Sequence, residues 1–109
     1  MAYFNMAIIL MIAKHAPENC PMFNEKTRKI FLEYDKKVGG LMKKHGIKNL
    51  GEYVVPNEHL IVGIYEATSS EVFNKFAMEP EIIVRGAFET AELKSAMSME
   101  EVMKMLKAK

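Results

Sequence analysis

Two histidines and one cysteine stand where a small sheet can bring them together. His15 ends an apolar stretch, Cys20 lies five residues later, and His59 opens a second apolar stretch. Imidazole and thiolate bind Zn, Cu, Fe or Ni, and both groups also support acid–base or thiol chemistry. The spacing matches no paired-cysteine zinc signature. His15, Cys20 and His59 are therefore candidates for a metal site or a catalytic site, with the reaction left open.

Acidic and basic residues add candidates to this set. Glu58, Glu79 and Glu81 are expected to flank the same end of the sheet, and the Glu81 carboxylate is a further candidate metal ligand. Arg85 is one of two arginines, and it could bind the carboxylate of a ligand or pair with a neighbouring glutamate. His45 is expected at the opposite end.

A structural role for the same residues is the alternative interpretation. Cys20 can be a small buried hydrophobic residue, and His15 and His59 can be hydrogen-bonded residues at the rim. The loop between His15 and the next helix contains Pro17 and Pro21, which restrict the backbone. Such a loop could hold a thiol in place or serve packing alone.

Apolar periodicity and turn residues define the elements that must position these side chains. Strands are predicted over residues 3–15, 50–55, 60–66 and 82–89, and helices begin at Asn24, at the capping box of residues 68–71 and at that of residues 98–101. Gly46 is predicted to end the first helix in a left-handed conformation. Residues 56–58 form a turn short enough to make its two flanking strands antiparallel.

This order predicts an α+β domain with the ferredoxin-like βαββαβ arrangement, a C-terminal helix in addition, and spatial strand order 4-1-3-2. The two central strands are apolar on both faces, whereas helices can cover only one face of the sheet. A second copy would cover the other face, so a homodimer is expected. One residue of Ile8 and Ile9, and one of Ile61 and Val62, should face that partner.

In this layout residues 3–90 resemble the dimeric α+β-barrel superfamily, which includes muconolactone isomerases and cofactor-free antibiotic-biosynthesis monooxygenases. The segment His15-Ala16-Pro17-Glu18-Asn19-Cys20-Pro21, with Met78-Glu79-Pro80-Glu81, resembles a prokaryotic family of that superfamily that has no established activity. No residues match a catalytic motif of either enzyme family. The resemblance therefore implies a fold and a dimer, and it assigns no reaction.

Length and composition limit the function classes. A chain of 109 residues suits a single domain over residues 1–109, and fifteen basic against fourteen acidic residues without a basic block do not indicate nucleic acid. Residues 59–66 also lack the aromatic pattern of an RNA-recognition motif. The longest apolar run is too short to cross a bilayer, and a lone cysteine suits a reducing compartment, so a cytoplasmic protein is expected. Abundant Glu and absent Gln resemble thermophile proteins, although ten Met argue the other way.

Two functions are consistent with these observations. The first is binding of a small molecule or a transition metal in a pocket at the end of the sheet that carries His15, Cys20 and His59. The second is a non-catalytic, dimerising regulatory or accessory module in which those residues are structural. A defined cavity favours the first function, and a filled interior favours the second.

Overall fold

A four-stranded antiparallel sheet forms the centre of the protein. The computed structural model describes residues 6–109, so residues 3–5 of the first predicted strand lie outside the described part. The strands are β1 (Ala7–His15), β2 (Lys48–Val55), β3 (Leu60–Ala67) and β4 (Glu89–Ala96). The α-helices are α1 (Glu25–Lys44), α2 (Ser70–Ala77), α3 (Pro80–Ile83) and α4 (Met99–Lys107).

The strands lie in the order β2-β3-β1-β4, which confirms the predicted order 4-1-3-2. Every neighbouring pair is antiparallel, and Ile9 of β1 stands between Tyr65 of β3 and Ser95 of β4. The turn at Pro56–Glu58 joins β2 to β3 as predicted. The two most apolar strands, β1 and β3, therefore occupy the centre of the sheet, where each pairs on both edges.

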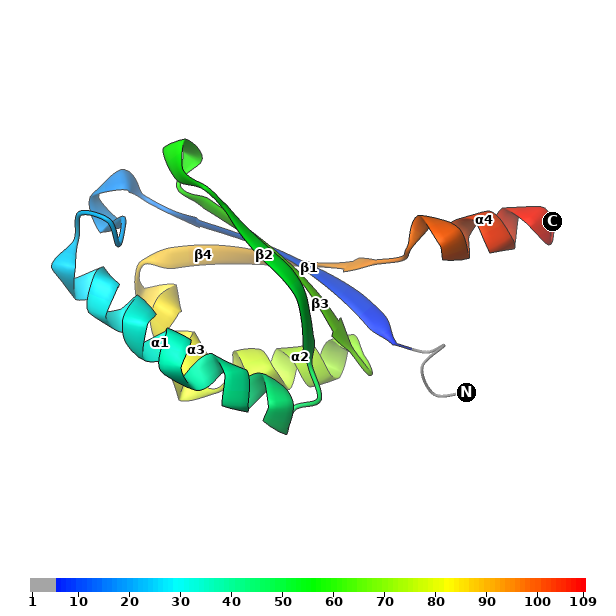
Figure 1. Ribbon diagram of the computed structural model, residues 1–109, viewed down its shortest axis with the longest axis horizontal. Helices are drawn as coiled ribbons and strands as arrows, with labels where there is room; N and C mark the ends of the chain where they lie inside the picture. The colour runs from blue at the N-terminus through cyan, green and yellow to red at the C-terminus, as the bar shows by residue number, and fades with distance from the viewer. Residues whose placement is uncertain (1–5) are drawn as a thin grey trace.

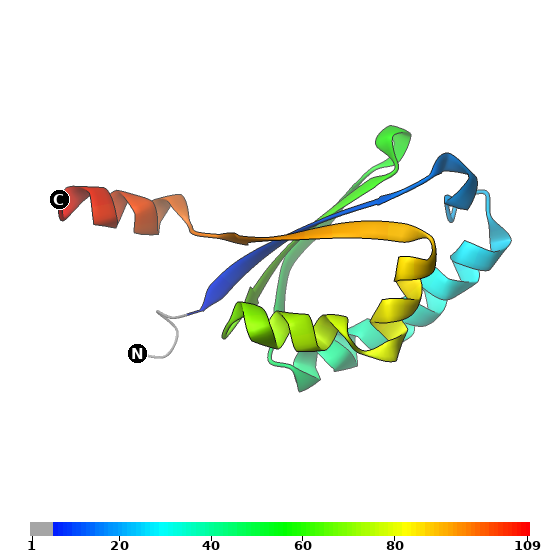
Figure 2. The same cartoon turned by 180° about the vertical axis from the view of Figure 1, so that it is seen from behind.

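Helices α1, α2 and α3 cover one face of the sheet, and α4 projects beyond it (Figures 1 and 2). The core between the sheet and the helices contains buried residues from both layers, namely Ile9, Met42, Ile47, Tyr65, Ala67, Phe73 and Phe76. Because strand side chains alternate, the register places Ile61 on the helix side with Ile9, and places Ile8 and Val62 on the open face. The structure thus decides which residue of each predicted pair faces away from the helices.

Capping residues set the helix ends largely as the sequence predicts. The Asn24 side chain accepts a hydrogen bond from the Thr27 amide at 3.0 Å, and Ser98 caps α4 in the same way at 3.1 Å. Gly46 follows α1 with φ of +67°, the predicted left-handed conformation. The box at residues 68–71 is displaced by one position, because Ser69 and not Thr68 is the N-cap of α2.

The prediction of a strand over residues 82–89 is wrong. Pro80 occupies the first turn of α3, where its missing amide costs nothing, and Val84–Ala87 continue as a 3₁₀ turn. The last strand, β4, begins only at Glu89. Its sequence is polar because it is an edge strand that is held to β1 by backbone hydrogen bonds along eight residue pairs.

Helix α4 is amphipathic but packs against no layer of the domain (Figure 1). Its apolar stripe includes Met99, Met103 and Leu106, which are 72%, 43% and 58% exposed. The described residues include no helix with the length and apolar character needed to cross a bilayer. The projecting α4 and the open face of the sheet are therefore two apolar surfaces that residues 6–109 leave uncovered.

Candidate metal site

The structure brings His15, Cys20 and His59 together at one end of the sheet. One possible ligand atom from each residue, an imidazole nitrogen or the Cys20 sulfur, lies within 4.8 Å of the others. The two imidazole rings meet edge to face, with centroids 5.3 Å apart and planes inclined at 66°. Three residues separated by up to 44 positions in the sequence thus form one cluster.

Backbone hydrogen bonds hold the three residues in place. His15 is the last residue of β1, and its amide donates to the His59 carbonyl at 3.2 Å, next to the start of β3. The Cys20 amide donates to the Pro17 carbonyl at 3.1 Å, which closes a 3₁₀ turn between two prolines. The β1–β3 pairing and the Pro-rich loop therefore position the cluster without help from its own side chains.

His59 has a left-handed backbone with φ of +53°, and it is the one non-glycine residue with positive φ in the described chain. Such a conformation is unfavourable for a residue with a Cβ, by about 1 kcal/mol or more. The turn Pro56–Glu58 imposes it, since the His59 amide donates back to the Pro56 carbonyl at 3.2 Å. Strained residues concentrate at functional sites, so this backbone is a second local mark of the cluster.

Three of the four imidazole nitrogens of the cluster are buried without a hydrogen-bond partner in the described residues. His15 Nδ1, His15 Nε2 and His59 Nδ1 are shielded from solvent, and none has a partner among residues 6–109. Buried polar atoms are nearly always paired, and leaving one unpaired costs about 1–3 kcal/mol. The hydrogen bonds that the alternative prediction assigns to these histidines are therefore not made by residues 6–109. Cys20 is buried, as the structural interpretation expected.

Burial also affects the charge state of His15. Desolvation lowers the pKa of His15 below its usual 6.5, with His59 and Arg85 acting in the same direction and the Glu89 carboxylate opposing them. His15 is therefore neutral at pH 7. A neutral imidazole is the form that coordinates a metal ion, so the environment favours the ligand state of His15.

An apolar cavity of about 610 Å³ adjoins the cluster. Its walls include His15, Cys20 and His59 together with Phe31, Val54, Ile61 and the loop residues Pro21, Met22 and Phe23. The volume lies within the range of small-molecule sites. The predicted cavity at this end of the sheet is therefore present, and it supplies space beside the three possible ligands.

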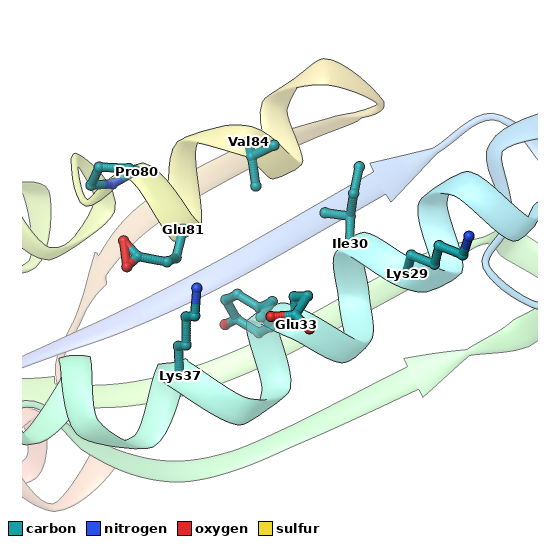
Figure 3. A pocket seen from close by; sticks show the side chains of 8 residues that line it. Lys29, Ile30, Glu33, Lys37, Pro80, Glu81 and Val84 are labelled. Atoms are coloured by element: carbon teal, nitrogen blue, oxygen red, sulfur yellow. The ribbon is translucent and has the colours of Figure 1, made fainter.

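The acidic residues predicted at the same end lie in different places. Glu58 belongs to the turn before His59. Glu79 lies at the opposite end, where its carboxylate is 2.6 Å from His45 Nε2 and 2.9 Å from Lys44 Nζ, so its placement beside His15 was wrong. Glu81 lies on α3 and faces Lys37 of α1 across a groove (Figure 3), apart from the three-residue cluster. Both errors follow from α3, which replaces the predicted strand.

Arg85 occupies the 3₁₀ turn before β4 and is buried. Its Nη2 lies 2.7 Å from Glu89 Oε1, and its guanidinium stacks between Phe31 and Tyr34 at 4.6 and 4.5 Å from the ring centroids. Of the two roles predicted for Arg85, the structure shows the pairing with a neighbouring glutamate. Tyr34 was not among the candidate residues, since its position on a helix indicates packing alone.

No family model matches the chain, and no curated protein is similar to it at a significant level. The geometry of the cluster is therefore the evidence for what His15, Cys20 and His59 can bind or catalyse. Two imidazoles and a thiol, close together and beside an apolar cavity, can bind a transition metal and leave one coordination position open. They can also present a thiol beside a base.

Proposed function

We propose that the protein binds a transition metal ion, of which Zn²⁺ is the first to test, through His15, Cys20 and His59. The observation that carries the proposal is the cluster itself, because three nitrogens of its imidazoles are buried without partners while the ligand atoms lie within 4.8 Å. A bound metal would take one nitrogen of each imidazole and so provide a partner for His15 and for His59.

The spacing is compatible with tetrahedral coordination after a small adjustment. Zn–N and Zn–S bonds of about 2.0–2.1 and 2.3 Å imply ligand atoms roughly 3.3–3.6 Å apart in a tetrahedral site. The cluster must therefore contract by roughly 1 Å, a movement that rotation of the Cys20 side chain and the exposed turn before His59 can supply. A reducing compartment would keep the single thiol available.

Three protein ligands leave a fourth position for water or for a small molecule. In this proposal the fourth position faces the 610 Å³ cavity, whose walls are mainly apolar. A bound metal could then hold the polar end of a small molecule whose remainder lies in the cavity. Ligand binding is thus part of the proposed function, and a catalytic step is not.

A purified, untagged sample prepared without chelator tests this function. Elemental analysis and native mass spectrometry should find one metal ion per chain, and calorimetric titration should show one Zn²⁺ site after metal removal. The variants His15→Asn and His59→Asn should each weaken binding by about 10-fold or more. His45→Asn, which changes the third histidine, is the matched control and should bind normally. Equal zinc binding by all four proteins would refute the proposal.

We also propose that two copies associate through the open face of the sheet, as a dimeric α+β barrel of ferredoxin-like domains. Central strands β1 and β3 place apolar side chains on that face, including Ile8, Leu10, Val62 and Ile64. The exposed stripe of α4 offers further apolar surface to the same partner. This arrangement is the second candidate function, a dimerising module, and it is compatible with metal binding.

Sedimentation equilibrium at micromolar concentration tests the dimer. Leu10→Glu, in the middle of the open face, should give a folded monomer, because the dimer would bury the added charge together with its neighbour Lys94 on β4, and the desolvation of such a pair outweighs their attraction. Leu32→Glu places the same charge at an exposed position of α1 and should leave the dimer intact. A monomeric wild-type protein, or an unchanged mass for Leu10→Glu, would contradict the proposal.

A further inference from the structure

A second cavity, of about 320 Å³, lies between the sheet and the helices. Its walls are mostly apolar and include Met11, Phe73 and Ile82. Its polar groups come from Tyr34, Tyr65, Arg85 and Glu89. None of the residues of the candidate metal site lines it. The cavity also lies on the helix side, so the proposed dimer would not cover it. It is therefore a separate feature of the molecule.

Arg85 is the best-fixed polar group of this cavity. Its Nη2 donates to Glu89 Oε2 at 2.8 Å, and the Phe31 and Tyr34 rings lie on its guanidinium. Its Nε is buried and has no hydrogen-bond partner in the described chain. The side chain is only 8% exposed, so water does not readily replace that partner. The guanidinium is thus held rigidly, and its Nε–H remains without a hydrogen-bond acceptor in the described residues.

The other groups of the cavity limit the charge of an occupant. Glu89 already neutralises Arg85, and both side chains are buried. Burial is the main cause that raises the pKa of Tyr34 and of Tyr65, so both hydroxyls stay neutral. A charged molecule would lose its hydration in this cavity without gaining a free countercharge. An uncharged molecule with one hydrogen-bond acceptor would lose little.

We propose that this cavity is a binding site for a small, uncharged, mainly apolar molecule that carries one acceptor oxygen, such as a ketone or an ether. Its acceptor would receive the Arg85 Nε–H, and its apolar part would lie against Met11, Phe73 and Ile82. The volume is at the lower end of the range for small-molecule sites, which limits the occupant to roughly the size of a substituted single ring.

Tyr34 indicates how such a molecule would enter. It is the only residue that lines both the inner cavity and the outer groove between α1 and α3, among the residues that the structure describes. Figure 3 shows that groove, with Ile30 of α1 on one side and Val84 on the other. The groove leads to the Tyr34 side chain, and the cavity is itself partly open to solvent, so an occupant would enter past that ring while the ring stays on the Arg85 guanidinium.

A titration of the ¹⁵N-labelled full chain with acetophenone, toluene and benzoate tests the proposal. The chain has two arginines, and Arg28 Nε already donates to the Pro21 carbonyl at 2.9 Å. Acetophenone should therefore shift the Arg85 Nε–H resonance in a saturable manner and leave that of Arg28 unchanged, with Arg28→Lys making the assignment. We expect acetophenone to bind about 10-fold more tightly than toluene, which lacks the acceptor, and more tightly than the charged benzoate.

Two variants that fill the cavity provide the controls. Ala91→Leu on β4 and Ala77→Leu on α2 add volume from opposite walls, so a failure of one to fold leaves the other. Each should weaken acetophenone binding by 10-fold or more and leave zinc binding unchanged, which separates this site from the metal site. Absence of a saturable Arg85 shift with all three probes, strongest binding by benzoate, or binding that both filling variants leave intact would each overturn the proposal.

Discussion

Both ends of the sheet contain histidine, but the chain provides the imidazole with a side-chain partner at one end only. At one end, His45 lies 2.6 Å from the Glu79 carboxylate, which Lys44 also contacts. At the other end, His15 and His59 lie beside each other and present nitrogens that have no partner in residues 6–109. The first arrangement is complete within the chain, and the second is not.

This difference separates a structural histidine from a candidate ligand. Folding normally satisfies buried polar groups, so the unpartnered nitrogens mark the place where the chain relies on something beyond itself. The adjacent thiol of Cys20 makes that missing partner a metal ion in our proposal. The comparison yields predictions because one substitution, histidine to asparagine, can be made at both ends.

The largest expected effect is the stabilisation by zinc. At a free zinc concentration 100 times the dissociation constant, the free energy of unfolding should rise by about 2.7 kcal/mol. His45→Asn should retain this gain, and His59→Asn should lose it. Asparagine tolerates the left-handed backbone of residue 59, so the variant removes the ligand while keeping the turn. Urea denaturation with and without zinc measures the effect, and equal gains in both variants would erase the proposed distinction.

Protection of Cys20 from alkylation is the second prediction. Its burial should make reaction with iodoacetamide slower than that of a free thiol, and zinc should slow it further. Because only the metal-free protein reacts, the rate at 100 times the dissociation constant should fall about 100-fold. Mass spectrometry of timed samples gives the rate. Zinc that leaves the wild-type rate unchanged would remove Cys20 from the site.

The pH dependence of stability should differ between the two ends. The pKa of His15 is lower in the folded protein than in the unfolded chain, so the unfolded chain takes up a proton at higher pH. The metal-free protein therefore loses stability as pH falls from about 6.5 toward the folded pKa of His15. The slope is at most about 1.4 kcal/mol per pH unit. Hydrogen bonds from His45 and Lys44 lower the pKa of Glu79, so that end loses stability only as pH falls below about 4.5.

Substitutions at each end assign these two pH windows. His15→Asn should flatten the stability curve near pH 6 and leave the acidic part unchanged. Glu79→Gln should do the reverse. Chemical denaturation at half-unit pH intervals provides the curves, and a loss near pH 6 that persists in His15→Asn would assign that window to another group.

The smallest effect is expected in metal-free protein at pH 7.5. Replacing His15 with asparagine breaks no side-chain hydrogen bond of the described chain, so the free energy of unfolding should change by less than about 1 kcal/mol. His45→Asn removes the contact with Glu79 and should destabilise the protein more. A larger loss for His15→Asn than for His45→Asn would reverse the roles assigned to the two ends.

Much of the fold could be predicted from local patterns. The apolar runs of β1 and β3, the short turn before His59 and the Asn24 cap each specify their structure through neighbouring residues. Residues 82–89 could not be assigned in this way, because a few alternating apolar positions suit a strand or a helical turn equally well. Pro80 is equally ambiguous, because a proline can follow the end of one helix or begin the next, and here it begins α3.

The candidate site was likewise predictable only where local sequence patterns determine it. The closeness of His15 and His59 follows from the antiparallel pairing of β1 with β3, in which Lys14 stands opposite Leu60. The position of Glu81 depends on α3, and the sandwich of Arg85 depends on how α1 packs on the turn before β4. Those contacts are tertiary, so no local pattern in the sequence encodes them.

X-ray absorption spectroscopy of the zinc-loaded protein tests the central claim most directly. The account predicts a first coordination shell with one sulfur at about 2.3 Å and two imidazole nitrogens at about 2.0–2.1 Å, with the remaining position held by a light atom. Cys20→Ser should remove the sulfur signal, and His45→Asn should leave the spectrum unchanged. A wild-type shell made of nitrogen and oxygen alone would contradict the assignment of His15, Cys20 and His59 as the metal site.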